Sequence, residues 1–398
     1  LCLARHSHHY IKHHMQSSPY HHAILNRRSL LLPLVVCLLL IGTPSAGLHA
    51  QAGDPAELQT DTTKKKGKGF IPIPIVFATP ETSWGFGGGA NYTFRFPGES
   101  ETSLTSQSQI LAAYTLNKQL LLYLSYQLFM KEERYKVYGE LGYYRYNYFF
   151  YGNGNQNTLE EGELYDVNYP RLRANALYLV QPNLYLGLRY WMDDFRIQNL
   201  DPEGRLANNN ITGSQGGLLS GVGLVMNYDT RDNIFVPYKG VYIESVLFRN
   251  GGFLGSDFNF SKLYLDASTY IRTFGQQTLA FNLYTEFTAG DPPFNQLSLM
   301  GSRRRMRGYY EGRYRDQHYI TFQGEYRMPL FWRLGIVLFG GYGAVANDFA
   351  EFSEPVWRHT VGAGLRVMID KKERINIRVD AGFGQNTSAY YFTIGEAF

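Results

Sequence analysis

The sequence predicts an all-β protein: a transmembrane antiparallel β-barrel of 16 strands, with a long loop between strands 11 and 12 that enters the lumen. Two observations lead to this fold class. Apolar and polar side chains alternate after residue 70, with charges of both signs on the polar face, as in a barrel with lipid outside and water inside. Aromatic residues are abundant, with 32 Tyr and 26 Phe beside 41 Gly, and such barrels gather aromatic side chains at the membrane interfaces.

Membrane spans in this chain are expected to be strands and not helices. After residue 50 no stretch approaches the roughly 20 apolar residues that a spanning helix needs, so any span is built from strands. The alternative is a soluble β-sandwich with one face in water. The number of strands and the export signal at the N-terminus fit that alternative poorly.

Residues 1–50 are predicted to be an upstream extension followed by a secretory signal peptide that is removed. Two arginines precede a short apolar run over 30–42, and small residues follow it, which is the layout of a signal peptide. The polar stretch 51–69 is predicted to be a short periplasmic linker. From there the composition does not change, so residues 70–398 are predicted to form one barrel.

Cysteine and histidine usage excludes several kinds of site. Both cysteines, Cys2 and Cys37, lie in the segment predicted to be removed, which leaves His318 and His359 as the histidines of the barrel. A disulfide framework and a multi-histidine metal site are therefore not expected. No nucleophile elbow or phosphate-binding loop is recognisable, so the protein is not expected to be an enzyme or to hold a cofactor. The formal net charge of +4 does not indicate nucleic-acid binding.

Sixteen periodic stretches, each ended by a turn signal, are predicted to be strands, and bacterial single-chain barrels have even strand numbers. The three longest connections, 149–163, 199–215 and 291–316, all follow odd-numbered strands and so leave the barrel on one side. Long external loops and short periplasmic turns are the expected asymmetry. The predicted strands are 71–78, 84–96, 106–117, 119–131, 134–148, 164–180, 183–198, 216–229, 239–250, 258–274, 276–290, 317–331, 333–346, 357–370, 373–383 and 388–398.

Three segments combine charged, glycine and aromatic residues in a recognisable order: the turn before strand nine, the long loop before strand twelve, and the last strand. Their residues are Asp229, Arg231, Asp232, Pro237 and Gly240; Met306, Arg307, Gly308 and Tyr309; and Tyr390, Phe392, Ile394 and Phe398. Together the three segments resemble the outer-membrane assembly and translocation superfamily, the BamA/TamA-like bacterial surface-antigen barrels. The resemblance covers about residue 70 to the end. It implies a periplasmic turn, a loop-six lumen motif and a C-terminal signal that assembly machinery reads.

The resemblance also implies partners for Arg307, whose side chain would enter the lumen and pair with acidic groups on strands twelve and thirteen. Glu325 matches the first of these groups. The second is usually an aspartate, but the strand-thirteen motif here contains Phe339, Gly341 and Gly343, with Gly341 at the aspartate's place. We therefore predict a latch with one carboxylate. Whether Arg307 takes part in transport or only stabilises a plugging loop stays open at this point.

The function that the resemblance implies is to help insert or translocate proteins, or lipids, at the outer membrane of a Gram-negative bacterium. Opening of a weak seam between the first and last strands is the expected mechanism, and Pro72 and Pro74 suit such an edge because proline donates no hydrogen bond. The expected partners are outer-membrane lipid, lipopolysaccharide, unfolded outer-membrane protein clients and the cell's barrel-assembly machinery. Fewer than twenty residues separate residue 51 from the first strand, so no periplasmic receptor (POTRA) domain is expected there. The alternatives are a passive pore, a structural barrel, or one half of a complex with a separate periplasmic partner.

Overall fold

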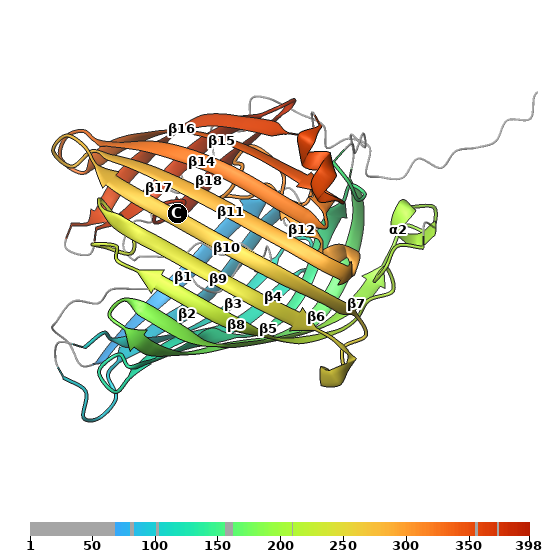
Figure 1. Cartoon of the computed structure of the whole chain (residues 1–398), viewed down its shortest axis with the longest axis horizontal. Helices are drawn as coiled ribbons and strands as arrows, with labels where there is room; N and C mark the ends of the chain where they lie inside the picture. Colours follow the sequence, from blue (N-terminus) through green and yellow to red (C-terminus); the bar gives the residue numbers. More distant parts are fainter. Residues whose placement is uncertain are drawn as a thin grey trace, which may run out of the picture. The chain divides into compact units, whose positions relative to one another are not determined.

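The computed structural model describes residues 68–79, 83–100, 103–155, 162–208, 210–354, 357–371 and 374–398. Sixteen long strands form one antiparallel sheet, and each strand pairs with its neighbours in chain order. Figure 1 shows them running side by side in a continuous curved sheet. The long strands are β1 (Lys68–Thr79), β2 (Ser83–Phe94), β3 (Ser106–Thr115), β4 (Leu120–Met130), β5 (Tyr135–Phe150), β6 (Glu163–Gln181), β7 (Leu184–Asn199), β8 (Gly217–Asp229), β9 (Gly240–Asn250), β10 (Asn259–Arg272), β11 (Thr278–Asp291), β14 (His318–Pro329), β15 (Leu334–Ala346), β16 (Arg358–Asp370), β17 (Ile375–Gly384) and β18 (Thr387–Ile394).

Short elements lie in the connections between the long strands. Two three-residue strands pair with each other between β11 and β14 and form a second, small sheet. The short elements are α2 (Arg205–Asn208), η3 (Gly252–Leu254), η4 (Phe294–Gln296), β12 (Ser298–Met300), β13 (Tyr314–Asp316) and η5 (Phe349–Ser353). Among the described residues, no helix has the length and apolar character needed to cross a membrane.

The predicted 16-stranded barrel is confirmed, and its predicted strand twelve is β14. Two boundaries differ from the predicted ones by more than two residues. The sheet begins at Lys68, inside the stretch predicted to be a linker, and the last strand ends at Ile394 instead of residue 398. The predicted signal peptide, and the linker up to residue 67, lie outside the described residues.

The barrel has two distinct ends. At the first, which we call the turn end, lie the connections from β8 to β9, β10 to β11, β14 to β15 and β16 to β17, each of at most about ten residues. At the second, the loop end, lie the long connections after β5, β7 and β11. This is the asymmetry that the sequence predicts.

Side-chain burial is inverted relative to a water-soluble protein, as a barrel in lipid requires. Large apolar side chains face outward, among them Phe322, which is 53% exposed, and Leu365, which is 62% exposed. Charged side chains are buried inside the barrel and paired. Arg171 forms an ion pair with Asp193 at 3.1 Å. Two further ion pairs join Arg189 to Glu244 and Lys262 to Glu286. A buried ionic group is tolerated when its partner is at hand, so the inner wall is a paired polar surface.

Candidate functional site: the arginine loop in the lumen

The loop between β11 and β14 folds back into the lumen. β12 and β13 pair at its base, with Ser298 opposite Asp316. Beyond them the chain turns at Met306, which has a positive φ of 48°. The side chains of Met306 and Tyr309 are buried in one apolar cluster with residues of the barrel wall, including Val345 on β15. Apolar packing therefore holds the tip of the loop against the inner wall.

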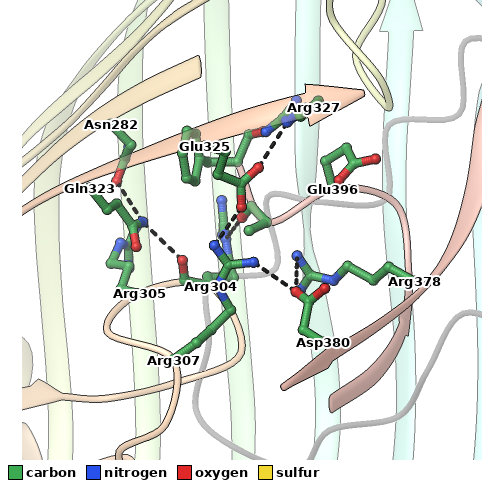
Figure 2. A network of polar contacts seen from close by, with 12 residues as sticks. Asn282, Arg304, Arg305, Arg307, Gln323, Glu325, Arg327, Arg378, Asp380 and Glu396 are labelled. Atoms are coloured by element: carbon green, nitrogen blue, oxygen red, sulfur yellow. Dashed lines mark hydrogen bonds and ion pairs between the residues drawn. The ribbon is translucent and has the colours of Figure 1, made fainter. Parts of the chain in front are cut away.

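Arg307 lies at this tip and binds two carboxylates at once. Its Nη2 donates to Glu325 of β14 at 2.5 Å, and its Nη1 donates to Asp380 of β17 at 2.7 Å. Figure 2 shows the guanidinium group lying between the two acids. Its Cζ atom also lies 3.5 Å from the centroid of the Phe339 ring on β15. Arg307 is 1% exposed, so it binds two acids and an aromatic face almost without solvent.

The predicted single-carboxylate latch is therefore wrong in its number of acids. Gly341 leaves the expected position without a carboxylate, and a Cβ there would lie 3.1 Å from Thr360 and 3.2 Å from Gln323. The second acid comes from β17 instead of β15. Asp380 points into the lumen and reaches the other terminal nitrogen of Arg307. The alternation of apolar and polar residues along this strand puts Asp380 on the polar, lumen-facing side. That pattern could have identified Asp380 as a candidate partner of Arg307.

The latch belongs to a larger buried ionic cluster that joins three strands and the chain's last residues. Arg327 donates to Glu325 at 2.8 Å, and Arg366 donates to Asp380 at 2.6 Å and to Glu396 at 2.8 Å. Arg378 lies 3.8 Å from Asp380. Four arginines thus face three acidic side chains, so the side chains of the cluster carry one positive charge in excess (four minus three). The arginines are Arg307, Arg327, Arg366 and Arg378, and the acids are Glu325, Asp380 and Glu396.

Hydrogen bonds anchor the motif to β16 and to the last strand of the sheet, β18. The Gly308 N–H donates to the Tyr391 hydroxyl at 3.0 Å, and the Thr387 hydroxyl donates to the Gly308 carbonyl at 2.9 Å. Tyr309 donates from its hydroxyl to the His359 carbonyl at 2.9 Å. The loop thereby contacts β18, the final strand, directly.

Gly308 is required by this close approach. Its φ is +110°, and a Cβ there would lie 2.9 Å from backbone atoms of Gly382, Phe383 and Gly384 on β17. Both features exclude a side chain. We expect Gly308→Ala to displace the loop tip and lower the free energy of unfolding by about 1–3 kcal/mol, measured by urea unfolding in lipid vesicles. Gly252→Ala is the matched control, because a Cβ at that position meets open space. An unchanged midpoint for Gly308→Ala would contradict the close approach.

The turn motif makes a structural cluster at the turn end. Arg231 bonds Asp229 at 2.7 Å, and Arg374 of the β16–β17 turn bonds Asp232 at 2.7 Å. Asp232 also accepts from the backbone N–H groups of Tyr238 and Lys239, in the segment that Pro237 begins and Gly240 ends. Gly240 has a φ of +115°, and a Cβ there would lie 2.4 Å from the Thr230 carbonyl. The motif therefore joins the β8–β9 turn to the β16–β17 turn.

This cluster predicts an acid dependence of stability. Partial burial alone would raise the pKa of Asp232, but the Arg374 guanidinium and two backbone N–H groups outweigh it and hold that pKa below its ordinary value of 3.8. A lowered pKa contributes stability that is complete above the unfolded-state pKa and is lost as pH falls through the folded one. We expect the urea midpoint of unfolding to fall as the pH is lowered from about 5 to about 2. The fall should be smaller in Asp232→Asn than in wild type. Asp201→Asn, at an exposed loop position, is the control; equal acid sensitivity in wild type and Asp232→Asn would contradict this assignment.

The predicted C-terminal signal divides into two parts. Tyr390 and Phe392 face outward, at 73% and 54% exposed. After Ile394 the chain leaves the sheet at Gly395, whose φ is +82°. Phe398 then turns inward and packs with Tyr270 of β10. The predicted last strand, 388–398, therefore extends too far, and Glu396 beyond it pairs with Arg366. The role of these residues as an assembly signal stays a prediction.

No metal or cofactor centre is evident at this site. Within the ranges that the structure describes, no group of three or more His, Cys, Asp or Glu side chains could hold a metal ion. The acids near Arg307 are occupied by arginines. The site is suited to holding a loop in place, through charge pairs and close backbone contact.

Fold and site together define a class: a transmembrane β-barrel whose long loop before the twelfth barrel strand is held in the lumen by an arginine. The family comparison agrees, since residues 86–398 match the Omp85 superfamily domain. The chain belongs to the Omp85 superfamily. No curated protein sequence matches it significantly.

Solved structures with the same fold share little sequence with this chain. BamA from Haemophilus ducreyi lacking POTRA domains 1-3 is 13% identical with a TM-score of 0.55, over 83% of this chain and 69% of that one. CdiB from Escherichia coli is 11% identical with a TM-score of 0.53, over 84% and 63%. CdiB from Acinetobacter baumannii is 12% identical with a TM-score of 0.51, over 82% and 59%. The chain therefore spans about three fifths of the length of the two CdiB proteins, and the likeness concerns the fold.

Proposed function

We propose that this barrel inserts or translocates unfolded proteins at the outer membrane of a Gram-negative bacterium. Membership of the Omp85 superfamily supports a role in outer-membrane assembly or transport. One structural observation carries the proposal further. The arginine loop binds β14 and β17 through Arg307 and contacts β18 through Gly308. A loop that holds the last strand of the sheet is placed to control how readily that strand opens.

The opening that we propose is the seam between β1 and β18. β18 has 8 residues, whereas β1 has 12, so pairing along the seam is limited by the shorter strand. Pro72 and Pro74 within β1 cannot donate hydrogen bonds to a neighbour. Separated strand edges present free backbone groups on which a client strand can add. In the proposed role the turn end of the barrel faces the periplasm, where clients arrive.

The proposed role is non-enzymatic and depends on other molecules. The clients are unfolded outer-membrane proteins, and the surrounding lipid includes lipopolysaccharide. A separate periplasmic partner, which is one of the alternatives named from the sequence, would bind at the turn end. None of these roles needs a cofactor.

The test is to time the folding of an unfolded outer-membrane protein in liposomes that hold the purified barrel. Cysteine pairs introduced across β1 and β18 allow the seam to be locked, and both native cysteines precede residue 51, so none lies in the barrel. We expect the barrel with the reduced cysteine pair to accelerate folding of the client, and the barrel with the oxidised pair to lose that acceleration. The same protein in two redox states is its own control. Equal acceleration in both states would contradict the seam, and ion flux without acceleration would contradict the insertase.

A further inference from the structure

A cavity of about 420 Å³ opens at the turn end of the barrel. Its walls come from the turns between β8 and β9, β10 and β11, β14 and β15, and β16 and β17, together with the segment after β18. Its size lies within the range of about 300–1,000 Å³ that is usual for ligand pockets. Arg307 of the arginine latch is not among the residues that line this cavity.

The cavity is strongly cationic. Six of its lining side chains are basic and two are acidic. Two further acids just outside the lining, Glu325 and Asp380, pair with Arg327 and Arg366, which leaves two positive charges in excess (six minus four). The two acids in the lining are already bound, Asp232 by Arg374 and Glu396 by Arg366. The six basic residues are Arg272, Arg327, Arg333, Arg366, Lys371 and Arg374.

Two arginines in the cavity wall have unused donors. Arg327 and Arg366 are 5% and 4% exposed. Among the described residues, Nη1 of Arg327 and Nη2 of Arg366 have no hydrogen-bond partner. Buried polar groups normally find partners, and a buried guanidinium favours a carboxylate or phosphate because its donors match their geometry. Both nitrogens are buried, so they add to the positive potential of the wall, and the excess of basic side chains lining the cavity favours an anionic ligand.

The wall already binds a segment of polypeptide that contains a glutamate, namely the last residues of this chain. Arg366 and the Asn376 amide both donate to the Glu396 carboxylate at 2.8 Å. Arg327 donates to a backbone oxygen of Phe398 at 2.7 Å. Apolar side chains adjoin these charges, including Trp332, which lines the cavity and is 74% exposed. Charge beside an aromatic surface suits a polypeptide segment better than a bare inorganic anion.

We propose that this cavity binds an acidic segment of another polypeptide, with carboxylates facing Arg272, Arg333 and Lys371 and an apolar residue against Trp332. Arg272 and Lys371 lie exposed on the rim. Arg333 approaches from the β14–β15 turn, where one of its nitrogens donates to the carbonyls of Met368 and Ile369. The binding is a property of the turn end and does not require that the barrel inserts proteins.

The test is calorimetric titration of the full chain in a non-ionic detergent. The probe is an acetylated, amidated peptide in which glutamate alternates with leucine, and its control has glutamine in place of glutamate. We expect saturable binding of the glutamate peptide only. Arg272→Gln combined with Lys371→Gln should weaken it about tenfold, as the loss of two exposed charge contacts predicts. Arg196→Gln, which removes an exposed arginine on β7 outside the cavity lining, is the matched control and should leave binding unchanged.

Three results would overturn the proposal. The first is equal binding of the two peptides, which would make charge irrelevant. The second is unchanged affinity in the double variant, which would place the peptide elsewhere. The third is displacement of the peptide by inorganic phosphate at equal concentration, which would make the cavity a site for small anions and not for a polypeptide. Far-ultraviolet circular dichroism of each variant establishes that the barrel is folded.

Discussion

Asp380→Asn is expected to lower the free energy of unfolding by about 3–5 kcal/mol, the usual cost of removing one partner from a buried ion pair. Asp380 is 0% exposed and binds Arg307 and Arg366. Its removal leaves four buried arginines with two acids, so the excess charge of the cluster rises from one to two. The side chain of asparagine keeps the shape of aspartate, and the loss therefore reports charge and not volume.

Urea unfolding in lipid vesicles measures this cost, with the fluorescence of the chain's 4 tryptophans as the signal. Asp194→Asn is the matched control, because Asp194 pairs with an arginine whose side chain is 65% exposed, and such pairs contribute about 0–1 kcal/mol. A cost for Asp380→Asn as small as that of Asp194→Asn would contradict the second carboxylate.

Arg307→Met is expected to free the loop while costing less global stability than Asp380→Asn. Without Arg307 the cluster contains three arginines and three acids, and every acid keeps a partner: Arg327 holds Glu325, and Arg366 holds Asp380. The loop, however, loses the contacts of its tip with β14 and β17. We expect amide hydrogen exchange over residues 302–312 to accelerate by at least about tenfold, which corresponds to 1.4 kcal/mol of local opening.

The matched control for the loop is Arg313→Met, which also removes an arginine from this loop but not one of the cluster. Its exchange over 302–312 should stay within about threefold of wild type. Unchanged exchange in Arg307→Met would mean that apolar packing around Met306 and Tyr309 alone holds the loop.

The barrel was predictable from the sequence because the same short-range pattern of apolar and polar residues recurs in strand after strand. Each strand alternates apolar and polar residues with period two, and a strand that is out of register would put charges such as Lys262 or Arg378 into lipid. The pattern therefore determines strand extent and side-chain direction at the same time. Glycines and prolines mark the turns, so most predicted boundaries lie within two residues of the observed ones.

The details of the latch were less predictable because they depend on distance across the lumen. Alternation places Glu325 and Asp380 on the inner face but does not say which of several inward acids Arg307 can reach. The resemblance to other barrels pointed to the strand of Gly341, whereas the carboxylate comes from β17. The inward turn of Phe398 was missed for a similar reason, since the ion pair between Glu396 and Arg366 competes with continued strand pairing and is not visible in a period-two pattern.

Arg307 holds the loop in the lumen by pairing with Asp380 as well as Glu325. The most direct measurement is the double-mutant cycle of Arg307→Met with Asp380→Asn in urea unfolding. Because Asp380→Asn leaves excess positive charge, removing Arg307 from that variant should restore stability. We predict a double variant that is more stable than Asp380→Asn alone by at least about 1 kcal/mol, within the range measured for residues in direct contact. A double variant less stable than either single variant, with additive costs, would contradict the pairing.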